Sequence, residues 1–384
     1  MAVVPQDKKP LNVMIVDDTI TYRAILKETL AGLDGVQSVA MAKNGQEALE
    51  KLDAFAKEQT PIDMVLLDVE MPVMNGIETL QQIRRRFPKV QVVMVSGVDP
   101  NSANTTFHAL ESGALDFVAK PSEGTTFQNI QNLRNKLVPL FQHVHASMAH
   151  FLPARSSVPP VQKPVVNHAP PLAQLPKTYS TIGFKPSVLA IGVSTGGPNA
   201  LKALLPKLPG NLGLPVVVVI HMPEVFTGYL ADSLNRLCAL TVCEARDGDV
   251  LKPNTVYIAP GGRHMVLERH GAEVAVATNL NPPENSCRPA VDVLFRSVAS
   301  VYGTGILNVV LTGMGNDGQK GVQAIRQRQG NITLTQSAES CVVYGMPKAV
   351  DDAGLSDESL SLEDISHRIT HLTSSLLFNK KEQS

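Results

Sequence analysis

Short apolar runs alternate with amphipathic segments between residues 11 and 140. The runs have the length and β-branched content of buried strands, and the segments between them place apolar residues at helical spacing. This alternation predicts a parallel sheet covered by helices on both faces, in a (βα)5 order. The predicted strands are Val13–Val16, Ser38–Ala42, Met64–Leu67, Val90–Val95 and Asp116–Ala119, and the predicted helices are Tyr22–Ala31, Gln46–Phe55, Gly76–Arg86, Ala103–Glu111 and Thr126–Phe141.

A second alternation of the same kind begins at Val188 and predicts another α/β domain, doubly wound and mostly parallel. Its predicted strands are Val188–Val193, Pro215–His221, Val256–Ala259, Met265–Glu268, Ile306–Thr312 and Asn331–Thr335, and its predicted helices include Asn199–Lys207, Thr227–Leu237, Pro289–Tyr302 and Gly318–Arg328.

The stretch between the two patterns differs in composition from both. From Phe151 to Pro186 it contains eight prolines, four basic residues and no acidic residue. Such a stretch cannot build a packed core and is typical of an extended, semi-stiff linker. We therefore expect an N-terminal domain over residues 11–140, a linker over 141–187 and a C-terminal domain over 188–377.

Composition narrows the class of protein. The 384 residues are 43% hydrophobic and 18% charged, with a net charge of −1, which is too balanced for a chain that mainly binds nucleic acid. The four cysteines have no paired spacing, which favours a reducing compartment and argues against structural zinc. The segment Met1–Pro10 lacks an apolar secretion signal, and no run approaches the roughly 20 apolar residues that span a bilayer. We expect a cytoplasmic protein without direct membrane insertion.

Carboxylates end two of the predicted strands in the first half. Asp17 and Asp18 directly follow Val13–Val16, and Asp68 follows Met64–Leu67. Because parallel strands carry their carboxyl ends to one edge of the sheet, the three acids are expected to converge there. Clustered carboxylates repel one another unless a hard cation lies among them, and Mg²⁺ prefers oxygen ligands. The pattern predicts a Mg²⁺ site in which Asp68 is the nucleophile that accepts a phosphoryl group.

Two more polar residues follow the next strands of the same predicted sheet. Ser96 comes after Val90–Val95, and Lys120 comes after Asp116–Ala119. A hydroxyl and an ammonium are the partners that added phosphoryl oxygens need. Any one of these residues, taken alone, is better explained as a helix cap or a solvated surface group. Five of them at strand ends favour a phosphoryl site.

The turn after Val188–Val193 carries a candidate nucleophile. Residues 194–198 read Ser-Thr-Gly-Gly-Pro, and together with Gly192 they form a G-x-S-x-G pattern at a strand-to-helix turn. The glycines allow a tight backbone that exposes the hydroxyl of Ser194, and the N–H groups of the following helix could stabilise an oxyanion. The pattern alone is weak, because it also fits a phosphate-cradling turn, although no lysine follows in Walker fashion.

A serine nucleophile needs a base and an orienting acid. His221 ends the apolar strand Pro215–His221, and Asp317 lies in a glycine-rich turn after a later strand. With Ser194 they form a candidate triad. Individually, the histidine fits a structural role and Asp317 a helix cap, and Asp292 is a rival acid whose helical setting favours a surface or capping role. The order Ser–His–Asp differs from that of ordinary α/β-hydrolases, so their fold is not implied.

Residues 11 to about 130 resemble the receiver domain of a bacterial two-component response regulator. The resemblance implies that Asp68 is phosphorylated by a partner histidine kinase, with Mg²⁺ bound at Asp17, Asp18 and Asp68. It also implies that Ser96 and Lys120 are the switch residues of the receiver. The matching motifs are Val16-Asp17-Asp18, Leu67-Asp68-Val69-Glu70-Met71-Pro72, Ser96-Gly97 and Ala119-Lys120-Pro121.

Residues from about Val188 to Leu377 resemble the catalytic domain of the chemotaxis receptor glutamate methylesterases. The resemblance implies that Ser194, His221 and Asp317 are the catalytic triad. The matching motifs are Gly192-Val193-Ser194-Thr195-Gly196-Gly197-Pro198, His221-Met222-Pro223 and Leu311-Thr312-Gly313-Met314-Gly315-Asn316-Asp317-Gly318.

The family resemblance covers nearly the whole chain and carries further expectations. It places Thr195 and Met314 at the oxyanion side of the site. The expected substrates are glutamate γ-methyl esters, and glutamines for deamidation, on methyl-accepting chemotaxis receptors, with no cofactor for ester hydrolysis. The unphosphorylated receiver is expected to obstruct the esterase, and phosphorylation of Asp68 to favour a state that packs there less well.

Two other functions compete with this one. The first is a non-enzymatic response regulator whose second domain only binds a partner; no helix-turn-helix or basic recognition segment is evident after Val188 to favour it. The second is a general small-ester hydrolase controlled by phosphorylation.

Overall fold

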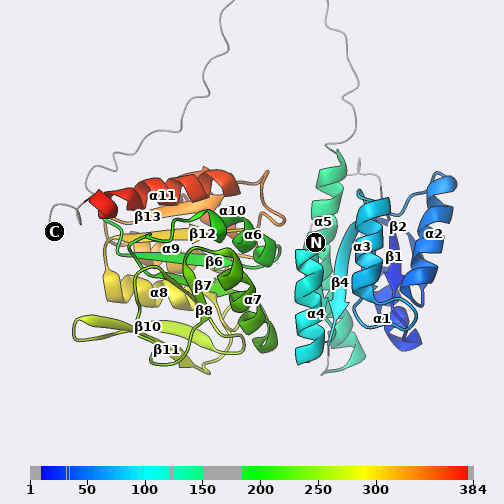
Figure 1. The fold of residues 1–384 in the computed structure, drawn as a ribbon, viewed down its shortest axis with the longest axis horizontal. Coiled ribbons are helices and arrows are strands. Elements are labelled where there is room, and N and C mark those ends of the chain that lie inside the picture. The colour runs from blue at the N-terminus through cyan, green and yellow to red at the C-terminus, as the bar shows by residue number, and fades with distance from the viewer. Residues whose placement is uncertain are drawn as a thin grey trace, which may run out of the picture.

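The computed structural model describes residues 10–149 and 184–378, apart from residues 32, 34, 98, 122 and 123. They form two α/β domains, each built on its own sheet (Figure 1). Most of the predicted linker, 141–187, lies outside the described residues, and its first part continues the last helix of the N-terminal domain. None of the helices in the described part of the chain combines the length and hydrophobicity that crossing a bilayer requires.

The sheet of the N-terminal domain has five parallel strands in the order β2-β1-β3-β4-β5. The predicted (βα)5 order is confirmed. Because the strand order reverses between β1 and β3, a ligand site is expected outside the carboxyl ends of these two strands. The elements are β1 (Leu11–Val16), α1 (Ile20–Ala31), β2 (Val36–Ala42), α2 (Gly45–Lys57), β3 (Met64–Asp68), α3 (Gly76–Arg86), β4 (Gln91–Ser96), α4 (Pro100–Glu111), β5 (Asp116–Ala119) and α5 (Thr126–Ala149).

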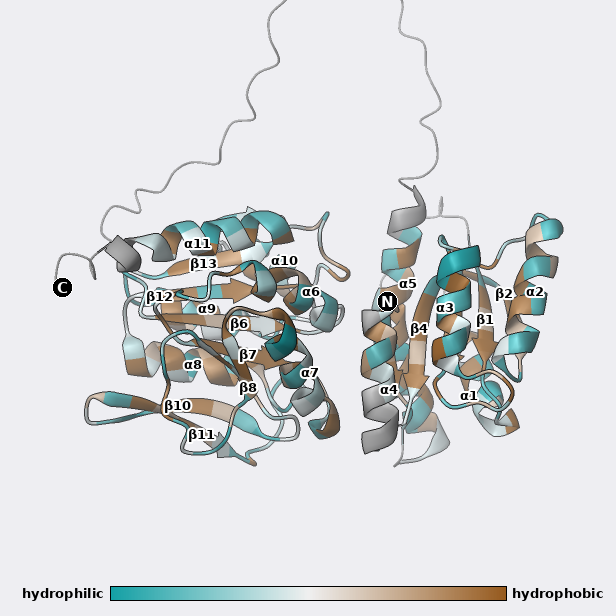
Figure 2. Cartoon of the chain, viewed as in Figure 1, coloured by the Kyte–Doolittle hydropathy of each residue, from teal (hydrophilic) through white to brown (hydrophobic). Residues whose placement is uncertain are grey.

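Helices cover both faces of this sheet, and alternate residues of β1 supply the two cores. Met14 and Val16 pack in a cluster with residues of α2 and α3, whereas Val13 and Ile15 pack in a cluster with residues of α1 and α5. Every residue of β1 and of β3 is buried. Nearly continuous apolar strands are what a sheet covered on both faces requires, and they are visible as brown arrows in Figure 2.

The sheet of the C-terminal domain has seven strands in the order β14-β13-β12-β6-β7-β9-β8, and every pairing is parallel. The prediction of a doubly wound, mostly parallel domain is confirmed. Two further strands form a separate antiparallel hairpin. The strands are β6 (Val188–Val193), β7 (Val216–Ile220), β8 (Thr241–Glu244), β9 (Thr255–Ile258), β10 (His264–His270), β11 (Glu273–Asn279), β12 (Ile306–Val310), β13 (Ile332–Gln336) and β14 (Glu358–Leu360).

The helices of this domain divide between the two faces of the sheet. On one face lie α6 (Gly197–Leu204), α7 (Glu224–Leu237) and α11 (Leu362–Phe378), and on the other lie α8 (Val291–Tyr302), α9 (Gln319–Arg326) and α10 (Met346–Asp352). The hydrophobic pattern does not indicate β8, β11, β14, α10 or α11. Of these, β8 and β14 are short strands at the two edges of the sheet. Both are only partly buried, so their sequences carry a weaker hydrophobic pattern than those of the central strands.

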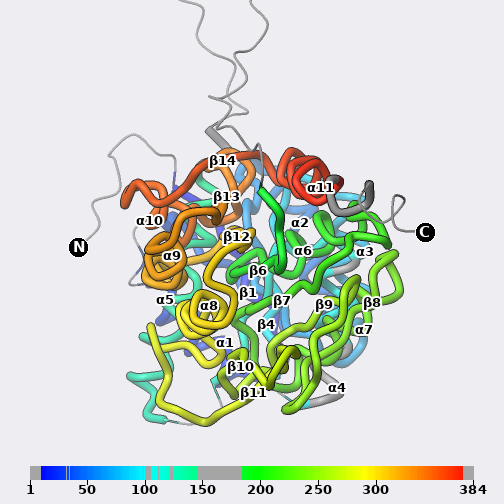
Figure 3. The backbone as a smooth tube through the Cα atoms, turned by 90° about the vertical axis from the view of Figure 1, so that its left-hand side faces the viewer, coloured from blue at the N-terminus to red at the C-terminus, as the bar shows by residue number. Residues whose placement is uncertain are grey.

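The two domains meet where α4 packs against α6 and α7 (Figure 1). Residues of β5 and α5 line a cavity at the same boundary. In the turned view of Figure 3 the C-terminal domain lies in front of the other. The ring of Phe117 stacks on that of Phe226, with centroids 4.6 Å apart. The side-chain amide of Asn199 donates to the carbonyl of Ala114 at 3.1 Å. Val342 of the C-terminal domain packs against the hydrophobic cluster that contains α5.

Candidate active site

Ser194 lies in a tight turn at the carboxyl end of β6. Its N–H donates to Thr312 O at 2.9 Å, and the N–H of Gly197 donates to Ser194 O at 2.7 Å. Gly196 has a φ of 75°, in the left-handed region that glycine adopts at little cost. A Cβ added at Gly196 would also lie 2.6 Å from atoms of Val342. The turn therefore requires glycine at this position.

His221 directly follows β7, and its ring lies between Ser194 and Asp317. Its Nδ1 is 3.0 Å from Ser194 Oγ, and its Nε2 is 2.8 Å from Asp317 Oδ2. An ionised carboxylate only accepts hydrogen bonds, so in the neutral ring Nε2 carries the proton and Nδ1 offers its lone pair to the serine hydroxyl. The structure thus brings the three predicted residues into one hydrogen-bonded chain.

Asp317 lies against the N-terminus of α8. Its Oδ2 accepts the N–H of Val291 at 2.7 Å, and its Oδ1 accepts the N–H of Asp292 at 2.9 Å. This approach depends on Gly192, because a Cβ there would lie 2.3 Å from Val291. Burial acts to raise the pKa of Asp317, but the bonds from His221 and the two helix N–H groups outweigh it and lower that pKa. An ionised carboxylate therefore faces the imidazole.

Burial likewise acts to lower the pKa of His221. The bond to Asp317 and the interaction with Cys287 outweigh burial and raise this pKa to about 9. The side chain of His221 is only 12% exposed, so these two partners dominate its surroundings. A pKa raised in this way favours the protonated imidazole at neutral pH, and only the neutral form can accept the proton of Ser194.

A cavity of about 270 Å³ opens over these residues at the boundary of the two domains. Thr195 and Met314, the residues predicted for the oxyanion side, both line it. The side chain of Met314 is 42% exposed. The N-terminal domain supplies part of the wall, so any substrate of Ser194 must approach beside it. The residues of the N-terminal domain that line the cavity are Asp116, Phe117, Val118, Ala119, Lys136 and Leu140.

Asp292, the rival acid, has a capping role. Its Oδ1 accepts the N–H of Gly318 at 2.9 Å and that of Gly321 at 2.7 Å, at the start of α9. The residue is 1% exposed, so a surface position is wrong. The acid bonded to His221 is Asp317.

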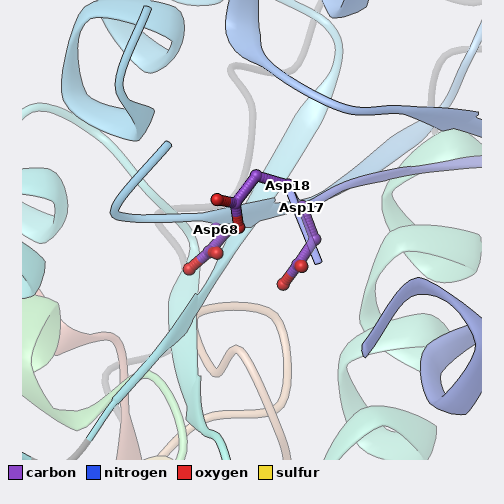
Figure 4. A group of neighbouring side chains, drawn as sticks. All are labelled: Asp17, Asp18 and Asp68. Carbon is purple, nitrogen blue, oxygen red and sulfur yellow. The ribbon is translucent and has the colours of Figure 1, made fainter. Parts of the chain in front are cut away.

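The predicted acids of the N-terminal domain meet at the carboxyl ends of β1 and β3 (Figure 4). Asp17, Asp18 and Asp68 each offer a carboxylate oxygen, and these oxygens lie within 4.8 Å of one another. Asp17 and Asp68 are buried and Asp18 is exposed, so the group opens to the surface on one side. Such hard oxygen ligands at this spacing fit a divalent cation of the Mg²⁺ type.

Lys120 reaches the same acids from the end of β5. Its Nζ lies 2.8 Å from Asp17 Oδ2 and 2.7 Å from Asp68 Oδ2. Burial raises the pKa of Asp68 to about 6, with Asp17 adding to the rise and Lys120 opposing it. Ser96, at the end of β4, is fully buried, and its Oγ accepts a bond from Thr106 Oγ1 at 2.5 Å. Lys120 thus bonds directly to Asp68.

Sequence reasoning missed several residues at the C-terminal site. Cys287 and Asn285 line the cavity from a loop without periodic pattern, and Lys136 and Asp116 reach it from the other domain. The turn-forming pair Asn-Ser at 285–286 was the only local signal for this loop. No signal in the sequence tells which residues meet across a domain boundary.

A receiver-type domain with an acid cluster at its switch point is joined here to a second α/β domain that carries a serine, histidine and aspartate in contact. This combination defines the class: a response regulator whose output domain is an enzyme.

Comparisons with known proteins narrow the class to one family. Residues 13–131 match the family model "Response regulator receiver domain", and residues 189–369 match the model "CheB methylesterase". The protein-glutamate methylesterase/protein-glutamine glutaminase of Desulfotalea psychrophila is 40% identical over 370 residues, covering 94% of this chain and 98% of the relative. That of Trichodesmium erythraeum is 41% identical over 364 residues, covering 93% and 97%. The chain belongs to the CheB protein-glutamate methylesterase family.

A solved structure is also similar to the C-terminal half. The CheB methylesterase catalytic domain of Thermotoga maritima matches with 40% identity and a TM-score of 0.48, covering 49% of this chain and 99% of its own.

Proposed function

We propose that this protein is a phosphorylation-activated hydrolase that demethylates glutamate γ-methyl esters, and deamidates glutamines, on methyl-accepting chemotaxis receptors. The relatives bear the names of both activities and match the chain along nearly its whole length. The observation that supports the mechanism most directly is the chain of contacts from Ser194 Oγ through His221 to Asp317.

In the first half of the reaction His221 Nδ1 takes the proton of Ser194, and Oγ attacks the ester carbonyl carbon. The resulting oxyanion needs N–H donors, for which the turn at Thr195 and the loop at Met314 are the candidates. Asp317 holds the tautomer of His221 that leaves Nδ1 free to accept. His221 then gives the proton to the departing methoxy group, which leaves as methanol.

In the second half a water molecule attacks the acyl-enzyme. His221 takes a proton from the water and returns one to Ser194 Oγ, which releases a glutamate side chain. With glutamine as substrate the same steps release ammonia instead of methanol. No cofactor is needed for either reaction, because proton transfer and charge stabilisation come from protein groups.

The receiver domain is the control element. Asp68 is the proposed phosphoryl acceptor, and a chemotaxis histidine kinase is the proposed donor. Asp17, Asp18 and Asp68 would hold Mg²⁺, which neutralises phosphoryl charge during transfer. Lys120, already bonded to Asp68, would pair with a phosphoryl oxygen, and Ser96 would donate its hydroxyl to another after a local rearrangement.

Regulation follows from the position of the receiver domain at the mouth of the cavity. Phe117 and Asp116 line the same cavity as Ser194, so a receptor segment that enters it meets the receiver domain while the domains are docked. Phosphorylation would activate the enzyme to the extent that the phosphorylated receiver docks less favourably. A cytoplasmic location accords with receptor helices as substrate and a kinase as donor.

The test is methanol release from methylated receptor by the purified full chain, with and without a small phosphodonor. Wild-type protein should release methanol faster with the donor, and Ser194→Ala should release none while keeping its unfolding temperature. Unchanged release by Ser194→Ala would refute the assignment. Comparable turnover of p-nitrophenyl esters, with no preference for receptor, would favour the general esterase, and no turnover of either would favour a partner-binding module.

A further inference from the structure

Asn285 joins two buried carboxylates beside the triad. Its Nδ2 donates to Asp317 Oδ1 at 2.8 Å and to Asp292 Oδ2 at 3.0 Å. A side-chain amide has two N–H groups on this nitrogen, so both are used. Asp317 is 2% exposed and Asp292 is 1% exposed, and two carboxylates this deeply buried repel each other unless donors lie between them.

The loop itself offers a simpler reason for an asparagine. The N–H of Glu284 donates to Cys287 O at 3.1 Å, and the N–H of Cys287 donates to Glu284 O at 2.9 Å. Asn285 and Ser286 between them have φ of 53° and 61°. This is the pattern of a type I′ turn, in which asparagine is common because it tolerates a positive φ. The turn explains the residue type but not the direction of its amide.

The amide completes the set of donors around Asp317. The carboxylate also accepts from His221 Nε2 and from the N–H groups of Val291 and Asp292. Oδ2 is shared by His221 and Val291, and Oδ1 by Asn285 and Asp292. With two donors on each oxygen the carboxylate cannot rotate without breaking bonds.

We propose that Asn285 is a positioning residue for catalysis, which fixes the plane and charge of Asp317 so that this acid holds His221 in line with Ser194. The inference rests on the proposed function, because it assigns a task to a residue that acts through the triad. Asn285 carries out this task through its amide alone. Its backbone conformation serves the turn.

Glycine at position 285 separates these two contributions. Asn285→Gly keeps the left-handed φ without strain and removes only the amide. We expect kcat with methylated receptor to fall about 10²-fold with KM within about twofold, since small misplacements of a catalytic group have effects of this size. The concentration of active enzyme is determined by titrating Ser194 with a substrate that gives a burst of product. Unfolded protein therefore does not affect the measured kcat. The enzyme is the full chain, activated with a phosphodonor.

Asn254→Gly is the matched control. Asn254 also has a positive φ, 64°, and its Oδ1 accepts the N–H of Gly213 at 2.6 Å, in a turn before β9. This variant makes the same change of residue at a turn outside the site, and it should keep wild-type kcat. Equal losses in the two variants would mean that the turn matters and the amide does not.

The pH profile of kcat for Asn285→Asp is a second measurement. A residue that only shapes the turn would leave this profile unchanged. It keeps the size and turn preference of asparagine but replaces a donor by a third acid. The two neighbouring carboxylates favour the protonated form of this third acid, which can still donate to Asp317, whereas its ionised form repels Asp317. The kcat of the variant should therefore fall as pH rises through the titration of the new acid, and wild-type kcat should show no such fall. The titratable and charged groups around this position in the C-terminal domain are His221, Asp292, Asp317, Glu284, Arg296, Cys287 and Lys320. Asp116 and Lys136 line the same cavity from the receiver domain.

The outcomes separate this inference from the function on which it rests. Wild-type kcat for Asn285→Gly, or a kcat profile of Asn285→Asp that coincides with the wild-type profile, overturns the positioning role even if Ser194→Ala is inactive. Methanol release by Ser194→Ala at the wild-type rate instead overturns the proposed function. A loss of kcat in Asn285→Gly with a fall of kcat at high pH in Asn285→Asp, beside an inactive Ser194→Ala, supports both.

Discussion

The carboxylate of Asp116 in the receiver domain accepts a hydrogen bond from the backbone N–H of Gly196 in the esterase domain, at 2.9 Å. Gly196 is the second residue after Ser194 and precedes the first turn of α6. The other oxygen of Asp116 accepts the N–H of Phe117, whose ring stacks on Phe226. The receiver is thus attached directly to the turn that carries the serine, and the strand that provides this attachment, β5, is followed directly by Lys120.

The first prediction concerns release of this contact. Asp116→Ala should raise methanol release by the unphosphorylated chain about tenfold, because a hydrogen bond to a charged group contributes about 1.5–3 kcal/mol. An isolated 188–384 fragment lacks the receiver domain and should show the highest activity that release of the receiver can give. Asp116→Asn should release the receiver in part, because an amide has one acceptor oxygen and one NH2 donor, whereas the N–H groups of Gly196 and Phe117 need an acceptor each. Equal activity of the fragment and the unphosphorylated full chain would contradict obstruction altogether.

The residues of the two sites could be predicted because each follows a strand. Val188–Val193 and Pro215–His221 are apolar enough to be recognised as buried, and polar residues that follow neighbouring parallel strands meet at the same edge of the sheet. Ser194 therefore meets His221, and Asp17 meets Asp68, because of the topology of the sheets. The hydrophobic pattern of the sequence predicts this topology.

Residues whose partners are set by loops or by domain docking could not be predicted. Asn285 gains its function from a turn that brings it to Asp317, and no periodic pattern connects the two. Asp116 begins a correctly predicted strand, yet its partner Gly196 lies across a domain boundary. The end of α5 was also missed: apolar residues such as Val144 pack against the N-terminal core and continue the helix to Ala149.

The second prediction concerns the phosphoryl acceptor. Asp68→Asn should take up no phosphoryl group from a small phosphodonor, because an amide oxygen is a far weaker nucleophile than a carboxylate. Its methanol release should therefore stay at the unphosphorylated level when the donor is added. Labelling with a radioactive phosphodonor and the methanol assay measure the two effects on the same sample. A variant still labelled at the wild-type rate would exclude Asp68 as the acceptor.

The third prediction uses the pKa of His221. A neutral imidazole is required to accept the proton of Ser194, so a pKa of about 9 means that activity of the unphosphorylated chain rises with pH up to about 9. Cys287 contributes to the raised pKa, and Cys287→Ala should lower it and move the acid limb of the profile to lower pH. The variant should consequently be more active than wild type at pH 7. The pH profiles of both proteins are measured with a p-nitrophenyl ester. If the profile of Cys287→Ala coincides with that of wild type, Cys287 does not raise the pKa of His221.

The fourth prediction concerns Gly313, which lies behind the serine. A Cβ at this position would lie 2.3 Å from Met346 Sδ and 2.8 Å from Ser194 Cβ. Gly313→Ala should lower the free energy of unfolding by about 1–3 kcal/mol through overpacking. It should also reduce turnover, because the serine is pushed from its place beside His221.

Gly228→Ala is the control for this substitution. Gly228 lies inside α7, and an added Cβ would meet only Glu244 oxygen and carbon atoms at 3.7 Å or more, which is ordinary contact. Alanine there should stabilise the helix by about 0.5–1 kcal/mol and leave turnover per active site unchanged. Thermal unfolding followed by circular dichroism, together with ester turnover, compares the two variants. If Gly313→Ala kept wild-type stability and turnover, the packing behind Ser194 would have to be looser than the 2.3 Å and 2.8 Å approaches imply.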